Sequence, residues 1–519
     1  MSAATIIGID IGSSFTKATI LDTAGQILAD VKRDTHPIQP RPGVAEYDGP
    51  SLLAAVYESM AELLDKSAVD PSDVAAICLD GMISGAMGID EAGDATTPYT
   101  TTLDTRFAPH LDYVLDHFHD PIRQLTGSGQ PTIAPKMLWI RQAFPDLYAR
   151  SAKFVTISGY VLGKLAGLPA GEAFLDYTYL WATGLSDTQH YAWSEELCRL
   201  LDLPMEKLPR IVRSSEIIGG LCREAAAATG LREGTPIVAG ASDQSAGFIG
   251  AAITRPNRMA SNAGTYPVLA ICTDQFRPDM ENRMAEIMPS VIPGLWNLVS
   301  YIIGGGLSHH WFQETFALAD EIEAQKLGED KSVYDVLDQR AEQVPPGSER
   351  LFFVPHLGGR ACPGNTDYKG SWFGFTWAHR REHFYRAILE GVAYEQWLQF
   401  QAFRASNPDL RVEEVTAYGG GSRSALWNQI KADVLGLPHV LLDREDLAPI
   451  GNAILAGYAL GIYGDMAEMA EGFVGRAGRV EPRPAIHAFY QPYAEFYSRL
   501  LGRIEPALAD LATLPEWPA

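Results

Sequence analysis

The sequence is poor in cysteine, with five residues in 519 that lie far apart and form no Cys-x-x-Cys pair. Scattered cysteines of this kind predict neither a zinc site nor a disulfide framework, as in proteins of a reducing compartment. Long hydrophobic runs are also missing, because the apolar stretch 295–307 is interrupted by three glycines and is too short to span a bilayer. The N-terminus shows no basic start and no apolar signal core. We therefore expect a cytoplasmic protein with no membrane partner.

Basic residues are in deficit, with 41 Lys and Arg against 64 Asp and Glu, which gives a formal net charge of −23. This charge argues against nucleic acid as a partner, because a polyanion would be repelled. It leaves a phosphorylated substrate open, since a phosphate site needs only local N–H groups, a metal ion or one lysine. The composition is that of a globular protein, with 46% hydrophobic residues. The length is too great for one core and predicts two large domains.

The first thirty residues predict a three-stranded meander that carries an aspartate beside a tight turn. Asp10 ends the first strand, and the turn Gly12-Ser13-Ser14 follows it. The bare N–H groups and hydroxyls of such a turn can cradle phosphate oxygens, and a nearby carboxylate can hold the accompanying Mg²⁺. The alternative interpretation is a plain β-hairpin with a solvent-facing aspartate.

A second aspartate opens a helix directly after a buried strand. Strand 236–239 is followed by Gly240 and by a helix that begins at Ser242-Asp243. Ligands of open α/β sheets bind at the carboxyl ends of the strands, which is where Asp243 is expected. Asp243 can cap the helix, and it can also accept a proton from a substrate hydroxyl. The two roles are compatible, because the helix dipole is expected to keep the carboxylate ionised.

The middle of the chain shows a weaker copy of the opening pattern. Segment 258–271 again runs strand, small-residue turn and strand, with Gly264-Thr265 in the turn. This similarity suggests two related halves with a hinge near residue 255.

Further helices and a glycine-rich turn follow this repeat. Helices are predicted at about 382–403 and 424–435, the second with Gly436 as its C-cap. A last helix at about 493–511 is expected to pack on the first domain. Three successive glycines at 419–421 precede helix 424–435 and fit neither the dinucleotide-binding nor the P-loop pattern. They allow a flat ring or a phosphate to approach the backbone, and the alternative is a flexible loop.

Eight short segments occur in an order that resembles one known family over nearly the whole chain. They include Gly8-Ile9-Asp10-Ile11-Gly12-Ser13-Ser14, Ala134-Pro135-Lys136-Met137-Leu138-Trp139 and Gly370-Ser371-Trp372-Phe373-Gly374-Phe375; the others are residues 103–106, 240–247, 263–265, 353–360 and 419–433. The sequence resembles the FGGY carbohydrate kinases of the actin/hexokinase/heat-shock-ATPase superfamily. This resemblance implies an α/β fold with two ribonuclease-H-like domains and a central cleft.

The resemblance also implies domain limits and cofactors. Residues 1–254 would form the N-terminal FGGY domain, with the sugar site, the first phosphate loop and the catalytic aspartate. Residues 255–485 would form the C-terminal domain, with the second phosphate loop and the adenosine site, and residues 486–519 a helical extension. ATP and Mg²⁺ would be the cofactors, and a homodimer would be the assembly.

Roles pass to individual residues by the same resemblance. Asp243 would be the general base, and Asp10 would lie at the metal. The residues around ATP would be Gly12, Ser13 and Ser14 at the phosphates, Gly264 and Thr265 at the γ-phosphate, and Gly420, Gly421 and Ser424 at the adenine end. The sugar-binding residues would be Ile83, Ser84, Asp104, Asp243 and Gln244.

The sugar-binding segments depart from the pattern of the xylulokinase branch. That branch has Ser-Gly-Gln-Met-His-Gly where this chain has residues 80–85, so that Ile83-Ser84 replace Met-His. Its Trp-Asn pair becomes Thr102-Leu103, while Asp104 and Arg106 are retained. A ketopentose such as D-xylulose is the expected substrate. The alternatives are another ketose, a tetrulose, a polyol or a signal sugar, and, from a different class, a nucleotide switch without transfer activity.

Overall fold

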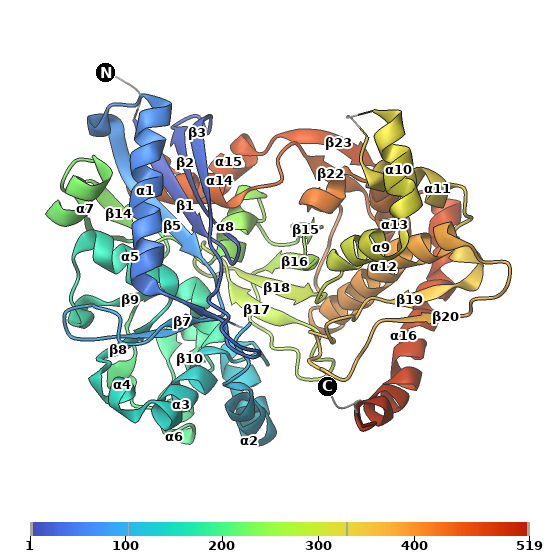
Figure 1. Cartoon of the computed structure of the whole chain (residues 1–519), viewed down its shortest axis with the longest axis horizontal. Coiled ribbons are helices and arrows are strands. Elements are labelled where there is room, and N and C mark those ends of the chain that lie inside the picture. Colours follow the sequence, from blue (N-terminus) through green and yellow to red (C-terminus); the bar gives the residue numbers. More distant parts are fainter. Residues whose placement is uncertain (1–3, 102, 329–330, 516–519) are drawn as a thin grey trace.

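The computed structural model describes residues 4–101, 103–328 and 331–515. They form two lobes, each built on its own mixed β-sheet (Figure 1). We call the lobe with the sheet that contains strand β1 the first lobe, and the one with the sheet that contains β15 the second lobe. Thr102 lies outside the described residues. Within the described ranges, the helices are all too short or too polar to cross a membrane.

The first sheet has six strands in the order β13-β14-β5-β1-β2-β3. In chain order they are β1 (Thr5–Ile11), β2 (Phe15–Asp22), β3 (Ile27–Asp34), β5 (Val74–Gly81), β13 (Ile217–Gly220) and β14 (Pro236–Val238). Strands β1, β2 and β3 form an antiparallel meander, as predicted, while β5 and β14 run parallel to β1.

The second sheet repeats this arrangement. Its seven strands are β15 (Met259–Asn262), β16 (Val268–Thr273), β17 (Glu286–Pro289), β18 (Trp296–Tyr301), β21 (Val415–Tyr418), β22 (His439–Leu442) and β23 (Arg476–Val480). Strands β15, β16 and β18 are an antiparallel meander, and β21 and β22 run parallel beside β15. The order β18-β16-β15-β21-β22 therefore matches β3-β2-β1-β5-β14 of the first sheet. The repeat predicted around Gly264 is confirmed.

Shorter elements join these sheets. The two-stranded pairs are β4 (Glu46–Tyr47) with β7 (Tyr99–Thr100), β6 (Met87–Ile89) with β8 (Lys153–Val155), β9 (Phe174–Asp176) with β12 (Arg210–Val212), β10 (Ser186–Asp187) with β11 (Ala192–Trp193), and β19 (Phe352–Val354) with β20 (Ser371–Phe373). The 3₁₀ helix η3 (Tyr177–Ala182) follows β9 directly.

The helices of the first lobe lie between its strands in the sequence, except the last one, which follows β14. They are α1 (Gly49–Ser67), α2 (Ala108–Thr126), α3 (Ile133–Ala143), α4 (Pro145–Arg150), α5 (Ile157–Ala166), α6 (Glu195–Leu200), α7 (Arg223–Thr229) and α8 (Asp243–Gly250). One face of the first sheet buries Ile7, Ile9 and Ile11 against α1, α5 and α7. This face follows from the alternation of the strand, because side chains two apart point the same way.

The other face of the first sheet is covered by helices from distant parts of the chain. Helices α14 (Ala448–Ala459) and α15 (Met466–Phe473) pack there with α8. The backbones of α8 and α14 approach so closely that a Cβ at Gly451 would lie 2.0 Å from the Ala246 oxygen. The first lobe therefore contains two helices that lie between strands β22 and β23 of the second sheet in the sequence, as Figure 1 shows beside β1 and β2.

The remaining helices belong to the second lobe: α9 (Leu307–Phe316), α10 (Leu318–Leu327), α11 (Val333–Glu342), α12 (Arg381–Ser406), α13 (Ala425–Leu435) and α16 (Pro484–Ala512). The predicted helices at 382–403 and 424–435 are confirmed as α12 and α13. The expectation that the last helix packs on the first domain is wrong. Helix α16 packs on α12 and α13, because its buried residues Tyr490, Tyr497 and Leu501 join the core of the second lobe.

The two lobes share a hydrophobic cluster. From the first lobe, η3 and Phe248 of α8 contribute buried side chains. From the second lobe, Val268, Ala270 and Val299 of its sheet meet them. The second sheet therefore packs one face on its own helix α12 and the other on the first lobe.

Candidate active site

Three aspartates lie at the carboxyl ends of adjacent parallel elements in the first lobe. Asp10 in β1 is paired in register with Asp80 in β5. Asp243 opens α8 after β14, the next strand, and Gly81 of β5 is bridged to Ser242 beside it. Asp10 and Asp243, which were predicted separately, therefore belong to one edge of one sheet, where open α/β folds bind ligands.

Burial, together with neighbouring carboxylates, raises the pKa values of the aspartates at this edge. Burial and the nearby charge of Asp446 raise the pKa of Asp10 to about 6, although a hydrogen bond with Asp80 and the charge of Lys17 act the other way. Burial and the charges of Asp10 and Asp243 hold the pKa of Asp80 well above its usual range. The carboxylates at this edge carry more negative charge than Lys17, the lysine beside them, can neutralise.

The pKa of Asp243 lies near neutral pH. Burial, followed by the charge of Asp10, raises the pKa of Asp243 to about 7, although its Oδ1 accepts a 2.7 Å hydrogen bond from the Gln244 N–H. The expectation that the helix dipole keeps this carboxylate ionised is therefore wrong as the dominant effect. Burial and the charge of Asp10 outweigh the hydrogen bond from the Gln244 N–H at the start of this helix. Ser242 is the N-cap residue, and its hydroxyl bonds the Ser245 hydroxyl at 2.9 Å.

The charge at this edge fits a divalent cation. Among the described residues, no group of three or more His, Cys, Asp or Glu forms a ready-made metal cage. Mg²⁺ does not need one, because it usually keeps several waters and binds one or two carboxylates together with phosphate oxygens. Asp10 is partly exposed and has a raised pKa, so a cation beside it would relieve the repulsion from Asp446.

The first predicted phosphate turn is open on its outer side. The Gly12 N–H donates to the Phe15 carbonyl at 2.9 Å and closes the hairpin between β1 and β2. Ser13 and Ser14 are exposed, and only their backbone carbonyls are bonded, to the Tyr47 hydroxyl and the Thr35 N–H respectively. Their hydroxyls have no partner within the described ranges, so they are available to a ligand.

The second predicted phosphate loop and the glycine turn form one unit in the second lobe. The Ala263 N–H donates to the Tyr418 carbonyl at 2.8 Å, and the Gly421 N–H donates back to the Ala263 carbonyl at 2.9 Å. Gly419 has φ +87°, and a Cβ there would lie 2.5 Å from the Asn262 Oδ1. Gly420 has open space around it and is exposed. The structure therefore places Gly264 and Thr265 beside the turn predicted to bind adenosine.

Ser424 has a structural role at the end of this turn. It is the N-cap residue of α13, where its Oγ accepts from the Trp427 N–H at 3.0 Å. The same hydroxyl donates to Asp338 of α11 at 2.5 Å. Asp338 was not predicted. Burial raises its pKa to about 6 despite the hydrogen bond from Ser424.

The predicted sugar loop is held from several sides. The Met82 N–H donates to the Ile11 carbonyl at 3.2 Å, and the Tyr99 hydroxyl donates to the Met82 carbonyl at 3.0 Å. The ammonium of Lys136 donates to the Ser84 carbonyl. Ile83 is buried in the hydrophobic cluster between the lobes.

Two other residues predicted to bind the sugar differ in whether their oxygens are free to bind a ligand. Asp104 is fully buried, and its oxygens accept from the Ala45 N–H at 3.1 Å and from the Arg106 guanidinium at 3.0 Å. The Gln244 Oε1 is buried and has no partner among the described residues. Asp104 therefore supports the wall of the site, and Gln244 retains an acceptor for a ligand.

Sequence reasoning missed three residues that complete the carboxylate edge. Asn452 of α14 donates to Asp80 and, at 3.1 Å, to the Ile9 carbonyl. Asp446, which precedes α14, forms a 2.5 Å ion pair with Lys17. Asp80 could have been found, because it ends a buried strand as Asp10 does.

Comparison with known proteins identifies the relatives of this chain. The model of the N-terminal domain of the FGGY family of carbohydrate kinases matches residues 5–250, and the model of the C-terminal domain of the same family matches residues 260–460. Similar sequences include a xylulose kinase of Bacillus subtilis, 26% identical over 95% of this chain and 96% of that protein. A gluconokinase of the same organism is 28% identical over 88% of each chain. An autoinducer-2 kinase of an Enterobacter species is 26% identical over 97% of this chain and 96% of that protein.

Solved structures show the same fold. A xylulose kinase from Lactobacillus acidophilus superposes with a TM-score of 0.88, at 24% identity over 98% of this chain and 100% of that one. A gluconate kinase from the same organism has a TM-score of 0.89, with the same identity and coverage. The fold class predicted from the sequence, two α/β domains of the actin/hexokinase kind, is confirmed.

Proposed function

The chain belongs to the FGGY family of carbohydrate kinases, and from this premise we propose that Asp243 is the base that activates the sugar hydroxyl. Its pKa of about 7 carries the proposal, because a general base works best when its pKa lies near the working pH. Gln244, next to it, offers a buried free acceptor for a second hydroxyl. By holding two hydroxyls of the sugar, Asp243 and Gln244 would orient the one bound to Asp243 for attack.

The residues of the two lobes would share the phosphates. Asp10 would hold Mg²⁺, which supplies charge neutralisation for the β- and γ-phosphates when bound. Gly12 would let the phosphates approach the backbone, and Ser13 and Ser14 beside it would offer N–H groups and hydroxyls from the first lobe. Gly264 and Thr265 would approach the γ-phosphate from the second lobe. Phosphoryl transfer passes through a loose transition state, so alignment of these groups contributes most of the rate. Placing them on two lobes would let sugar binding close the cleft and exclude water.

We propose a neutral ketose, D-xylulose or a close relative, as the acceptor. Two cationic side chains, Arg106 and Lys136, lie next to the predicted sugar-binding residues among those described, and each is close to a carboxylate. Arg106 is paired with Asp104 and Glu46, and Lys136 lies near Asp104. A sugar acid such as gluconate would meet the aspartate edge with no spare cation to offset its charge. The names of the relatives leave gluconate and a signal sugar as the main alternatives to a ketose such as xylulose.

The deciding experiment measures ADP release with Mg²⁺–ATP against a panel of ketopentoses, tetruloses, polyols, a signal sugar and gluconate. Stimulation by D-xylulose above all others would support the proposal, and stimulation by gluconate above every ketose would overturn the choice of substrate. ATP hydrolysis that no sugar changes would favour a nucleotide switch.

The role of Asp243 has its own test. Asp243→Ala should lower turnover ~10²–10⁴-fold, because a positioned base contributes about that much. Nucleotide binding, measured by calorimetry, should remain within about threefold, since Asp243 belongs to the sugar end. Turnover retained in this variant would refute the assignment.

A further inference from the structure

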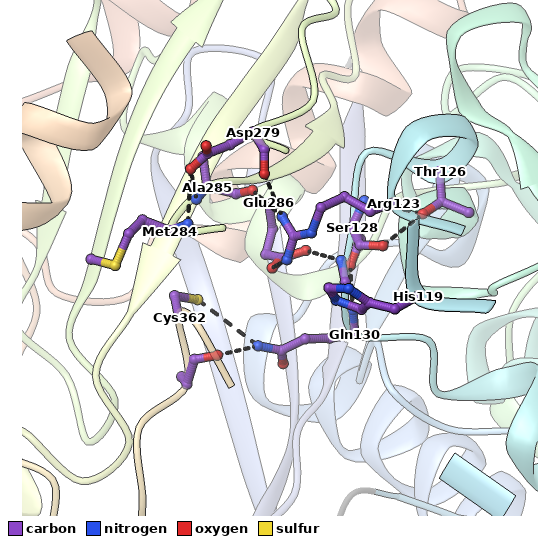
Figure 2. Close-up of polar contacts among 12 residues, drawn as sticks. His119, Arg123, Thr126, Ser128, Gln130, Asp279, Met284, Ala285, Glu286 and Cys362 are labelled. Carbon is purple, nitrogen blue, oxygen red and sulfur yellow. Dashed lines mark hydrogen bonds and ion pairs between the residues drawn. The ribbon is translucent and has the colours of Figure 1, made fainter. Parts of the chain in front are cut away.

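The two lobes are joined at one place by a buried ion pair. Arg123 of α2 is 2% exposed and Glu286 of β17 is 1% exposed. The guanidinium donates to Glu286 at 3.1 Å and to the Ala285 carbonyl at 3.1 Å, and the Gly129 N–H donates to the other Glu286 oxygen at 2.8 Å (Figure 2). Separating these groups would leave a buried charge unpaired, so the contact is held firmly.

The backbone strengthens this joint. Strand β17 is the edge strand of the second sheet, and its Ile287 N–H donates at 2.9 Å to the Gly127 carbonyl of the first lobe. Gly127 has φ +79°, and a Cβ there would lie 2.8 Å from the Ile287 Cβ. Segment 127–129 is therefore fixed to the second sheet at a distance only glycine permits.

Gln130 follows this fixed segment, and its amide reaches further into the second lobe. Its Nε2 donates to the Ala361 carbonyl and lies 3.9 Å from the Cys362 Sγ, as Figure 2 shows. Its Oε1 accepts from the hydroxyl of Tyr301. Both hydrogen-bonding atoms of the amide are thus used between the lobes.

Tyr301 connects this contact to the second phosphate loop. It ends β18, opposite Val268 of β16. The next residue, Ile302, donates to the Pro267 carbonyl at 3.0 Å, and the Gly306 N–H donates to the Thr265 carbonyl at 3.2 Å. A shift of Tyr301 would therefore move the loop predicted to hold the γ-phosphate.

The chain after Gln130 leads to the predicted sugar loop. The Thr132 N–H donates to the Ala182 carbonyl at 2.9 Å, and α3 begins at Ile133. One turn later, Lys136 donates to the Ser84 carbonyl. Gln130 therefore lies between the segment that supports the sugar loop and the segment that supports the second phosphate loop.

We propose that Gln130, through its hydrogen bond from Tyr301, is a positioning residue that sets the sugar hydroxyl and the γ-phosphate at reacting distance. This inference rests on the proposed function and adds a coupling role for residues that touch neither substrate. Small errors of alignment cost much in a reaction of this kind, and a 1 Å displacement can cost ~100-fold. The contact would also favour transfer to the sugar over transfer to water.

The test compares Gln130→Ala and Tyr301→Phe with the wild type, using the best sugar of the panel. Turnover should fall ~10–100-fold in each variant, while KM for sugar and for ATP stays within about threefold. The ratio of ADP released to sugar phosphate formed should rise. The double variant should be no worse than the worse single variant, because both changes remove one contact.

Controls separate this inference from folding and from the function itself. Tyr301→Phe keeps the buried ring and removes only the hydroxyl, so its structure should persist, which circular dichroism can verify. Gln142→Ala should behave as the wild type, because Gln142 is exposed and its side chain bonds His110 alone among the described residues. Unchanged turnover, strictly additive losses, or a rise in the KM for sugar alone would overturn the positioning role. A wild type that phosphorylates no sugar would instead overturn the proposed function.

Discussion

At the scale of single residues, the raised pKa that suits Asp243 to act as a base also lowers the stability of the folded protein. Asp243 has its pKa raised from 3.8 to about 7, so its ionisation opposes folding. Below about pH 4 the residue is protonated in both the folded and the unfolded chain. Between pH 4 and 7 the unfolded chain has already lost the proton, so the stability of the folded protein falls as the pH rises.

Asp243→Asn should therefore melt at a higher temperature than the wild type above pH 7, by several degrees, although we expect it to be inactive. The difference should shrink as the pH is lowered from 8 to 5. Scanning calorimetry in EDTA without nucleotide measures it, with the exposed Asp65→Asn as control. A difference that does not change with pH would contradict the raised pKa.

Lys136 supports the predicted sugar loop through a hydrogen bond to the Ser84 carbonyl. It is fully buried, and burial lowers its pKa to about 7 although Asp104 acts in the opposite direction. Lys136→Met keeps the length of the side chain but leaves the Ser84 carbonyl without its donor, which costs ~1–3 kcal/mol. We expect KM for sugar to rise ~5–100-fold while KM for ATP is unchanged.

Steady-state kinetics provide the measurement for Lys136→Met, and Lys164→Met is the matched control. Lys164 is partly exposed, and within the described part of the chain its ammonium contacts Asp94 alone, in an ion pair of 2.7 Å. Equal effects of the two substitutions on KM for sugar would show that Lys136 has no specific role in the loop.

At the scale of elements, the contact between α8 and α14 depends on a glycine. A Cβ at Gly451 would lie 2.0 Å from a backbone oxygen of α8, and neither backbone can yield easily. Gly451→Ala should therefore destabilise the protein by ~1–3 kcal/mol or more, as overpacking of a core does. Since α8 carries Asp243, turnover should fall as well.

Gly247→Ala in α8 is the matched control, because a Cβ there meets no heavy atom within 4 Å. Alanine should leave stability unchanged or raise it by ~0.5–1 kcal/mol, the usual gain over glycine inside a helix. Urea unfolding of the two variants checks both expectations. If Gly451→Ala were as stable as Gly247→Ala, the close packing of the two helices would be refuted.

Elements with local signals were predictable from the sequence. The turn Gly12-Ser13-Ser14 and the C-cap Gly436 predicted where β1 and α13 end, near their observed bounds. The partner of a helix was not predictable. Helix α14 is apolar on all sides, so its sequence predicts burial without saying against which sheet. The last helix, α16, was predicted to pack on the wrong lobe, because the sequence of a helix does not show which surface covers its apolar face.

The residues of the candidate site also divide into those that the local sequence predicts and those that it does not. Asp10 and Asp243 were found because each stands where a strand ends or a helix begins, and Asp80 offered the same signal. Asn452 could not be found, since its partner Asp80 lies 372 positions away. Gln130 is equally hidden, because its role arises only when the second lobe lies against it.

At the scale of the whole molecule, the buried pair Arg123–Glu286 should hold the lobes together. Arg123→Met should cost ~3–5 kcal/mol, because it leaves Glu286 buried without its partner. The double variant Arg123→Met/Glu286→Met should cost clearly less than the single one, since two apolar side chains need no partner. Urea unfolding followed by fluorescence measures both. A double variant whose loss equals the sum of the single losses would contradict a direct pairing.

The position of α14 also bears on how the protein is made. A ribosome releases the strands of the first sheet early, but the helix that covers Ile6, Leu21 and Cys78 comes from residues 448–459 of 519. During most of translation, this apolar face of the nascent first lobe is therefore covered by α8 without α14 and α15. The N-terminal half cannot mature before the C-terminal half is synthesised, so the two halves must finish folding together, and the growing chain presents a surface suited to molecular chaperones.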